Sequence, residues 1–504
     1  MSGGIGEWVR FWGRYDPAGV AVLWGEERHT WADLARCVRS LARGLRDAGV
    51  QIGDRVAVLA PNCPEFVHAV FATADAGGIF VPLNPRLTED ELSYALRHCD
   101  PRVLIVHPSL RELADAVASA AAATERFDLG PERPGSRSYA ALAATAAPAD
   151  DEVTVSGDQP VLLMFTSGTT GYPKAALLSH ANVSAIAQAS TACDALRPGD
   201  RMVLGMPLAF TGALVTQCLP IVAAGCSMVL RDSMDGDTLL DDIERHGVTY
   251  AYGVPLFYER IASSARFSSA DLSTWRGAKS GGAPVPQAVL QTFNARGVTM
   301  VSAYGLTEAG GFNLQLHGSR ALDKLGSVGV PVPGMRAKVV DAAGRDVGTG
   351  EVGELLLSGP SVMIGYWRDP EATAAVLRDG WLSTGDQAVV DEDGFFSIVG
   401  RKNDMLISGG LNVYPAEVER VLAAHPDVTA VAVVGAPDER WGEMPVAFVV
   451  AQRPELTLEE LRHHCTGLLA DYKRPRRLVL VDELPLTLSG KVRKAALRTW
   501  ALST

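Results

Sequence analysis

The sequence predicts an α/β protein of several domains, and three observations carry this prediction. From His29 to Tyr304, apolar stripes of helical period alternate with short apolar runs, which is typical of strand–helix–strand units and largely parallel sheets. Between about residues 326 and 399 the pattern changes to short strands and turns, which predicts a small antiparallel sheet or barrel. Mixed α/β patterning follows Gly400, over a stretch long enough for a separate small domain.

Individual segments follow this alternation in chain order. Residues 29–49 carry an apolar stripe that ends at a glycine and predict a helix, and residues 55–61 predict a short buried strand. Later segments repeat the pattern, with strands expected over 226–230, 248–254 and 298–304 and helices over 235–247 and 286–297. Residues 116–158 are rich in Ala, Pro and Ser and predict a surface excursion between subdomains.

Composition narrows the functional class. The net charge of −12 argues against a nucleic-acid partner, which needs a basic face. The seven cysteines form no CxxC pair and favour a reducing, cytoplasmic location over a disulfide framework or a zinc site. The N-terminus has no signal-peptide pattern, and no apolar run is long enough to span a membrane, so we expect no integral membrane contact.

A loop of small polar residues follows the apolar strand 161–165 and ends at Lys174. Glycines let backbone N–H groups turn toward one point and hydroxyls add donors, so such a loop can cradle phosphate oxygens. Any four-residue piece of it is more often an ordinary turn, but the full string TSGTTGxPK is far more specific. The spacing of its glycines and lysine differs from the GxxxxGK[ST] of a Walker A loop, so we disfavour an ordinary P-loop NTPase.

The string resembles the phosphate loop of the adenylate-forming superfamily, and the chain is similar to its acyl-CoA synthetases over nearly its whole length. Four further motifs of that superfamily follow in order, YGLTEAG at 304–310, WLSTGD at 381–386, GRKNDMLISGGLNVYPAEVE at 400–419 and PLTLSGKVRK at 485–494. The resemblance implies a large N-terminal domain (1–400) of stacked mixed sheets with helices, which includes a small antiparallel β-barrel (about 326–399). A small, mobile α+β cap domain (401–504) follows.

The resemblance also implies the chemistry. A carboxylate attacks the α-phosphate of ATP to give an acyl-adenylate and pyrophosphate, and the thiol of coenzyme A then displaces AMP. ATP, Mg²⁺ and coenzyme A are the implied cofactors and substrates. Lys491, Thr307 and Glu308 would be the catalytic residues, because a crowd of anionic oxygens needs cations and donors. Glu308 would also hold Mg²⁺, a hard cation that prefers oxygen ligands.

The implied binding residues fall into four groups. Contacts to ATP and AMP are expected from Thr166, Ser167, Gly168, Thr169, Thr170, Gly171, Lys174, Gly282, Ala283, Tyr304, Asp386 and Arg401. The acyl pocket is expected at Phe210, Thr211, Gly212, Gly281, Gly310 and Phe312. Coenzyme A is expected at Ser408, Gly409, Gly410, Trp441, Tyr472, Lys473 and Arg474, with the hinge at Asn403. The alternative is that Trp441 is a core residue and that residues 472–474 are a basic run in contact with solvent, which explains these residues equally well.

The expected acid is an apolar monocarboxylic acid, bulky acids included, because the pocket stretches 210–214, 280–283 and 303–313 carry no Lys or Arg. Three positions depart from the family pattern: Ala175 after the loop lysine, Phe210 in place of a frequent histidine, and Asn403 at the hinge. They motivate the alternative of an enzyme with impaired adenylation that mainly converts acyl-adenylate to acyl-CoA. Transfer to a carrier-protein thiol, a luciferase-like oxygenase and a homodimer also stay open, whereas Lys491, Glu308 and Asp386 argue against a non-catalytic binder.

Overall fold

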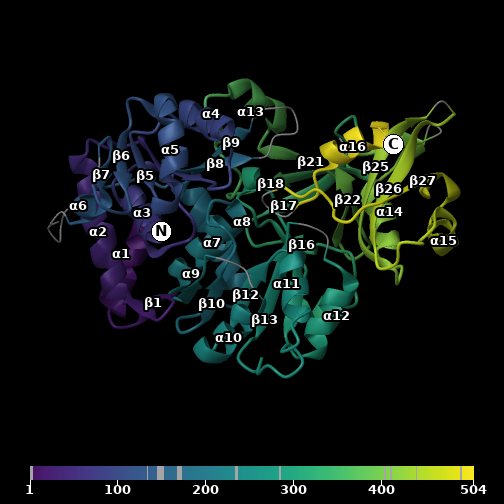
Figure 1. Cartoon of the computed structure of the whole chain (residues 1–504), viewed down its shortest axis with the longest axis horizontal. Helices are drawn as coiled ribbons and strands as arrows, with labels where there is room; N and C mark the ends of the chain where they lie inside the picture. Colours follow the sequence, from purple (N-terminus) through teal and green to yellow (C-terminus); the bar gives the residue numbers. More distant parts are fainter. Residues whose placement is uncertain are drawn as a thin grey trace.

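The computed structural model describes residues 4–132, 134–144, 153–166, 173–232, 236–282, 285–401, 404–408, 411–438, 440–487 and 491–503. Two large sheets and one smaller antiparallel sheet lie together, and a fourth sheet lies toward the C-terminal end of the molecule (Figure 1). This arrangement is the mixed α/β architecture with stacked sheets that the resemblance implied.

The first large sheet has nine strands, and those from β14 to β1 pair in parallel. Its order is β16 (Val330–Pro331), β15 (Leu314–Gln315), β14 (Thr299–Tyr304), β13 (Gly277–Gly281), β12 (Tyr250–Gly253), β10 (Arg201–Leu204), β11 (Ser227–Leu230), β1 (Val20–Trp24), β2 (Glu27–Thr30). Side chains alternate between the faces. Ala251 and Ala278 pack into a core that also contains α10–α12 residues, and Tyr250 and Tyr252 pack into the core on the other face.

The second large sheet has eight strands. Its order is β19 (Gly365–Tyr366), β9 (Lys174–Ser179), β8 (Pro160–Thr166), β4 (Ile79–Leu83), β3 (Arg55–Leu59), β5 (Val103–Val106), β6 (Glu125–Asp128), β7 (Arg137–Ser138). The expectation of a surface excursion over 116–158 is wrong for β6 and β7, because β6 pairs in parallel with β5 and buries Phe127 and Asp128 completely. Strands this short carry too few apolar positions to produce a periodic signal.

The two smaller sheets follow in the sequence. The predicted antiparallel unit contains β17 (Arg336–Val340), β18 (Gly353–Ser358), β21 (Trp381–Val390), β20 (Leu377–Arg378) and β22 (Phe396–Arg401). Two short segments of the predicted unit, β16 and β19, join the large sheets instead. The fourth sheet contains β24 (Leu411–Val413), β23 (Leu406–Ser408), β26 (Gly442–Ala451), β25 (Val428–Asp438) and β27 (Arg477–Leu480). The chain changes sheet between Arg401 and Leu406, beside the predicted domain boundary, which stays a prediction.

Helices cover the sheets and fill the space between the two large ones. They are α1 (Gly6–Tyr15), α2 (Trp31–Asp47), α3 (Pro64–Asp75), α4 (Glu89–Cys99), α5 (Arg111–Ala116), α6 (Tyr139–Ala143), α7 (His180–Cys193), α8 (Thr211–Ala213), α9 (Leu219–Ala224), α10 (Gly236–His246), α11 (Pro255–Ala262), α12 (Gln287–Ala295), α13 (Pro370–Val376), α14 (Pro415–Leu422), α15 (Leu458–His464) and α16 (Lys494–Ser503). The largest core joins α2, α3, α7 and α9 to inward residues of both sheets. None of the helices in the described ranges is long and apolar enough to cross a membrane.

Local signals explain where the helices begin. Thr30 and Ser179 each form a capping box with the residue three positions later, and these boxes start α2 and α7. A π-helical turn, η3 (Leu214–Cys218), interrupts the path from α8 to α9 beside the predicted acyl pocket. Such turns are rare and occur frequently at functional sites.

We expect His180, the first residue of α7, to make stability depend on pH. Its buried ring accepts a hydrogen bond from the Ile5 amide, and burial lowers its pKa from 6.5 to about 4. As the pH falls, the unfolded chain therefore binds a proton on His180 before the folded chain does. The stability that the neutral ring contributes is complete above pH 6.5 and is lost as the pH falls toward 4. The lowered pKa corresponds to a change of up to about 3 kcal/mol in the free energy of unfolding.

Urea unfolding between pH 7 and pH 4 measures this dependence. His180→Gln cannot titrate and should flatten the fall in the free energy of unfolding over that window. His317→Gln, which replaces an exposed histidine, should leave the fall unchanged. Identical pH profiles for the wild type and His180→Gln would contradict the assignment.

Candidate active site

The centre of the candidate site is the buried carboxylate of Asp386, on β21. Arg401 is its partner across β21 and β22, and the Arg401 Nε lies 2.7 Å from Asp386 Oδ1. The Tyr304 hydroxyl, at the end of β14, donates to Asp386 Oδ2 at 2.5 Å. Two different sheets therefore bring these three predicted residues together.

Burial controls the charges at this centre. Desolvation raises the pKa of Asp386, while Arg401, the Tyr304 hydrogen bond and Lys491 oppose the rise. The pKa of Tyr304 is raised well above its ordinary value by burial and by the neighbouring Asp386 carboxylate. Tyr304 therefore keeps its proton and remains a hydrogen-bond donor to Asp386.

Lys491 reaches the same centre from the C-terminal part of the chain. Desolvation and Arg401 lower its pKa, and the carboxylates of Asp386 and Glu308 oppose that shift. A closed turn holds the backbone there, because Thr487 N donates to the Lys491 carbonyl at 2.6 Å and Lys491 N donates to Thr487 Oγ1 at 3.0 Å. The structure thus gathers Lys491, Asp386, Glu308 and Arg401 into one electrostatic cluster, although they come from distant motifs.

Thr307 and Glu308 lie on the short turn η4 (Thr307–Ala309) directly after β14. The Thr307 and Thr211 hydroxyls lie 2.9 Å apart, which joins two predicted groups, the catalytic turn and the acyl pocket. The turn is crowded at Gly305, where a Cβ would lie 2.2 Å from the Gly311 carbonyl carbon. A side chain at position 305 would therefore displace the turn.

Tyr366, on β19, is a site residue that the sequence analysis missed. Its hydroxyl donates to Glu308 Oε1 at 2.8 Å, and the Lys174 Nζ lies 5.0 Å from the centroid of its ring. Tyr366 therefore connects the predicted phosphate lysine to the predicted metal carboxylate. The only sequence signal was an aromatic pair, Tyr366-Trp367, after a glycine, which is not specific.

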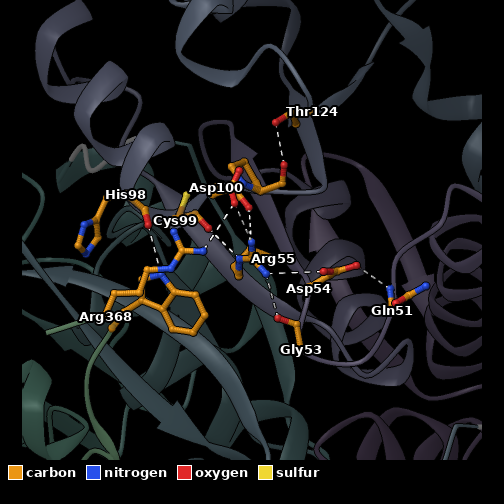
Figure 2. A network of polar contacts seen from close by, with 11 residues as sticks. Gln51, Gly53, Asp54, Arg55, His98, Cys99, Asp100, Thr124 and Arg368 are labelled. Atoms are coloured by element: carbon orange, nitrogen blue, oxygen red, sulfur yellow. Dashed lines mark hydrogen bonds and ion pairs between the residues drawn. The ribbon is translucent and has the colours of Figure 1, made fainter. Parts of the chain in front are cut away.

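A polar network around Arg55, at the N-terminal end of β3 in the eight-stranded sheet, anchors the segment after Tyr366 (Figure 2). The Trp367 Nε1 donates to the His98 carbonyl at 3.2 Å, and the guanidinium groups of Arg55 and Arg368 lie 5.4 and 5.3 Å from its ring. Arg55 and Arg368 also both approach the carboxylate of Asp100, at 3.5 and 3.6 Å. This packing limits the positions that Tyr366 can take beside Glu308.

The phosphate loop is described only at its two ends. Thr166 Oγ1 donates to the Lys174 carbonyl at 3.2 Å and closes the β8–β9 pair. The predicted residues Ser167, Gly168, Thr169, Thr170 and Gly171 lie outside the described residues. Ala175 is buried and belongs to the apolar cluster of Leu163 and Leu177. Its methyl group therefore packs in the core of the eight-stranded sheet, which weakens one reason to expect impaired adenylation.

The predicted acyl-pocket residues lie on the nine-stranded sheet and on the segments that cover it. At Gly281 a Cβ would lie 2.7 Å from the Ala303 carbonyl oxygen, and at Gly310, with φ +75°, it would lie 2.1 Å from Ile186 Cδ1. Both positions therefore require glycine. The Gly212 carbonyl accepts bonds from Thr216 Oγ1 at 2.6 Å and from Gln217 Nε2 at 3.0 Å, so hydrogen bonds join α8 to the π-helical turn.

Fewer close contacts surround Gly282 and Phe210. Gly282 has φ +79°, and a Cβ there would make an ordinary contact with Val254 at 3.7 Å, so its backbone conformation and not crowding favours glycine there. Ala283 lies outside the described residues. Phe210 is partly buried and precedes α8.

Lys279 is a buried cation that the sequence analysis overlooked, one residue before the predicted stretch 280–283. Its Nζ lies 3.8 Å from the centroid of the Phe312 ring and 2.5 Å from Asp194 Oδ2. The sequence signal for Lys279 was a lysine inside a strand of small residues. No sequence signal indicated its partner Asp194, which lies 85 positions earlier in the chain.

The predicted coenzyme A residues fall into two places in the fourth sheet. Ser408 pairs with Gly442, the residue after Trp441, and the Arg476 guanidinium lies 4.2 Å from the Trp441 ring. The Lys473 Nζ forms an ion pair with Glu417 at 2.7 Å, and Arg474 Nε donates to the Leu469 carbonyl at 3.1 Å. These two cations thus have partners within the C-terminal part of the chain. Gly409, Gly410 and Asn403 lie outside the described residues. Tyr472 is partly buried against the apolar cluster around Val418 and Leu461, and the Lys473 Nζ lies 5.9 Å from its ring.

Residues 10–367 match the family model of AMP-binding enzymes, and residues 417–491 match that of the AMP-binding enzyme C-terminal domain. The chain therefore belongs to the AMP-binding enzyme family.

Three similar proteins define the activity. A feruloyl-CoA synthase of an Amycolatopsis species is 42% identical, with 98% of each chain covered. An indoleacetate–CoA ligase of Aromatoleum aromaticum is 39% identical, over 98% of this chain and 97% of the relative. The crystal structure of ATP-bound MatB from Rhodopseudomonas palustris superposes with a TM-score of 0.91, at 32% identity and 99% coverage of both chains. The chain is an ATP-dependent acyl-CoA synthetase, with a carboxylic acid and coenzyme A as substrates.

We expect Tyr366→Phe to slow the adenylation half-reaction. It removes one hydrogen bond to the Glu308 carboxylate, and a lost bond to a charged group costs roughly 1.5–3 kcal/mol, or about 10- to 100-fold in rate. Acid-dependent ATP–pyrophosphate exchange should fall by that factor, while thiolysis of a synthetic acyl-adenylate should change little. Tyr15→Phe, at the exposed end of α1, is the control, and unchanged exchange in Tyr366→Phe would refute the role.

Proposed function

We propose that this acyl-CoA synthetase activates an apolar monocarboxylic acid with an aryl group, in two steps on one site. The observation that carries the proposal is the pocket face around Gly281 and Phe312, where the buried cation Lys279 is neutralised by Asp194. Lys279 is therefore not free to bind a second carboxylate. The names of two relatives, which specify feruloyl and indoleacetate substrates, also support an aromatic acid.

In the first step the acid's carboxylate oxygen forms a bond to the α-phosphorus of ATP, and the bond to the β-phosphate oxygen breaks to release pyrophosphate. Lys491 would neutralise the carboxylate and the α-phosphate together. The hydroxyl of Thr307, held by Thr211, offers a hydrogen bond to a phosphate oxygen. Lys174 carries the positive charge at the end of the phosphate loop.

A Mg²⁺ ion fits this site through Glu308. The described residues contain no cluster of three His, Cys, Asp or Glu side chains that could hold a metal alone. Mg²⁺ in nucleotide sites is usually bound by one or two carboxylates plus phosphate oxygens and water. Glu308, positioned by Tyr366, supplies such a carboxylate, and the ion would neutralise phosphate charge when bound.

Asp386 serves both steps by holding the AMP portion. A carboxylate can accept a hydrogen bond from each of two adjacent ribose hydroxyls, and Arg401 and Tyr304 already orient it. Tyr304 would stack on adenine from the end of β14. Since AMP stays bound until the thiol displaces it, loss of Asp386 would weaken both half-reactions.

In the second step the thiol sulfur attacks the acyl carbon and the bond to AMP breaks. We infer that residues 401–504 rotate as a cap about Asn403, because Lys491 is needed only before pyrophosphate leaves. The segment Ser408–Asn412 and Trp441 would then face the thiol channel, and the pairing of Ser408 with Gly442 supports a common site for them. The stacked Trp441 and Arg476 suit an adenine with phosphates.

A panel of carboxylic acids tests the proposal, with release of AMP and pyrophosphate measured in the presence of coenzyme A. Cinnamate and phenylacetate should support turnover at lower KM than malonate or short aliphatic acids such as butyrate. Preference for malonate would refute the apolar pocket. Product formation with an acyl-carrier protein but not with coenzyme A would support the carrier-protein alternative.

The impaired-adenylation alternative is decided by isotope exchange. Phe210 and Asn403 are the remaining observations in its favour, since Ala175 packs in the core. A fully active enzyme should show acid-dependent ATP–pyrophosphate exchange at a rate at least equal to its overall turnover. Thiolysis of synthetic acyl-adenylate without such exchange would favour the alternative, and Phe210→His should then restore some exchange.

We expect Lys491→Ala to separate the two half-reactions. Removal of one charge-stabilising group costs about 10²–10³ in rate, so ATP–pyrophosphate exchange should fall by that factor. Thiolysis of synthetic acyl-adenylate should be retained, because Lys491 has no role after pyrophosphate leaves. Arg493→Ala, which removes a neighbouring exposed cation, is the control, and equal loss of both half-reactions in Lys491→Ala would contradict the cap rotation.

A further inference from the structure

One face of the nine-stranded sheet carries polar side chains that the two steps above do not use. Across the sheet, Tyr252 pairs with Lys279, Gly281 pairs with Ala303, and Ala303 pairs with Gln315. Register partners share a face, and Lys279 and Gly281 share one because side chains alternate along β13. Tyr252, Lys279, Gly281 and Gln315 therefore all face the side where the acyl pocket is predicted.

A buried ion pair organises this face. The side chains of Lys279 and Asp194 are 4% and 0% exposed, and their charged atoms lie 2.5 Å apart. Asp194 Oδ1 also accepts hydrogen bonds from the Tyr250 hydroxyl and Gln315 Nε2, both at 3.2 Å. Breaking such a pair by removing one partner leaves an uncompensated buried charge. The two charges thus cancel, and the face is polar but neutral.

Two polar atoms on this face are buried without a hydrogen-bond partner among the described residues, the Tyr252 hydroxyl and Gln315 Oε1. The amide orientation of Gln315 is fixed, because only its nitrogen can donate to the Asp194 carboxylate. An unsatisfied buried polar group costs about 1–3 kcal/mol, so native structures rarely leave one unpaired without a reason. Tyr252 offers a donor and Gln315 offers an acceptor.

The distance along β13 fits one aromatic ring. Gly281 marks the predicted boundary between acyl group and nucleotide, and Lys279 lies two residues deeper in the same strand. At about 3.3 Å per residue, the row of Lys279 and Tyr252 lies roughly 7 Å beyond Gly281, a span comparable to a benzene ring with a substituent opposite its carboxyl-bearing group. Gln315 lies in the row of Gly281, and its amide nitrogen donates to Asp194, the partner of Lys279. The Phe312 ring, stacked against Lys279 at 3.8 Å, would contact the face of such a ring.

We propose that Tyr252 and Gln315, held by the Lys279–Asp194 pair, form the far wall of the acid site and select aryl acids with a hydroxyl group on the ring opposite the carboxyl chain. The proposal rests on the proposed function. A phenol can donate to Gln315 Oε1 and accept from the Tyr252 hydroxyl at the same time. A second carboxylate is disfavoured, since Asp194 already neutralises the lysine.

The test compares matched acids with and without the hydroxyl group: 4-hydroxycinnamate against cinnamate, and 4-hydroxyphenylacetate against phenylacetate. Sites built to bind a hydroxyl reject analogues that lack it, so kcat/KM for coenzyme A-dependent AMP release should be at least about tenfold higher for the hydroxylated acid of one pair. Tyr252→Phe and Gln315→Leu should each bring that ratio close to one, because each lowers kcat/KM for the hydroxylated acid more than for the unsubstituted acid. Tyr139→Phe, a buried tyrosine in α6, should keep the wild-type ratio.

The outcomes separate this inference from the proposed function. Equal kcat/KM for the two acids in both pairs with the wild type, or a ratio that survives in both variants, overturns the inference alone. Turnover of octanoate but of no aryl acid overturns the proposed function and the inference together. Should Gln315→Leu fail to fold, as judged by its urea unfolding midpoint, the ratio in Tyr252→Phe decides.

Discussion

The burial of one carboxylate, that of Asp386, is the constraint on which the rest of the site depends. A carboxylate removed from water needs partners, and here they come from the nine-stranded sheet through Tyr304 and from the antiparallel sheet through Arg401. Lys491 adds a third contribution from the C-terminal segment. The parts of the chain are thus held together by the same charges that we propose bind the nucleotide, so architecture and chemistry cannot be separated at this point.

Much of the fold was predictable because it depends on local patterns. The helices α2, α10 and α12 and the strands β12 and β14 lie within the ranges that their apolar periodicity predicted. Contiguous motifs also located Tyr304, Glu308, Asp386 and Lys491, which the structure gathers. The error at β6 and β7 has a physical cause, since these two strands together carry a single apolar residue, Phe127, and so produce neither an apolar run nor an alternation.

The remaining site residues were not predictable because they act through contacts between distant segments. Tyr366 matters only because β19 pairs with β9 and so places its hydroxyl beside Glu308. Arg476 is an ordinary basic residue until β27 pairs with β26 and brings it to Trp441. The significance of Lys279 likewise depends on Asp194, which is too far away in sequence for any periodic pattern to connect the two.

The Lys279–Asp194 pair restricts how acid specificity can evolve in this chain. Strands β12 to β15 form one continuous stretch, 250–315, that carries Tyr252, Lys279 and Gln315, whereas Asp194 lies outside it. Exchange of that stretch for one with an apolar residue at position 279 would leave a buried carboxylate unpaired, at a cost of about 3–5 kcal/mol. During evolution, positions 194 and 279 must therefore change together, or the protein must pass through a poorly folded intermediate. The two segments are thus constrained to evolve together, although recombination could otherwise exchange them independently.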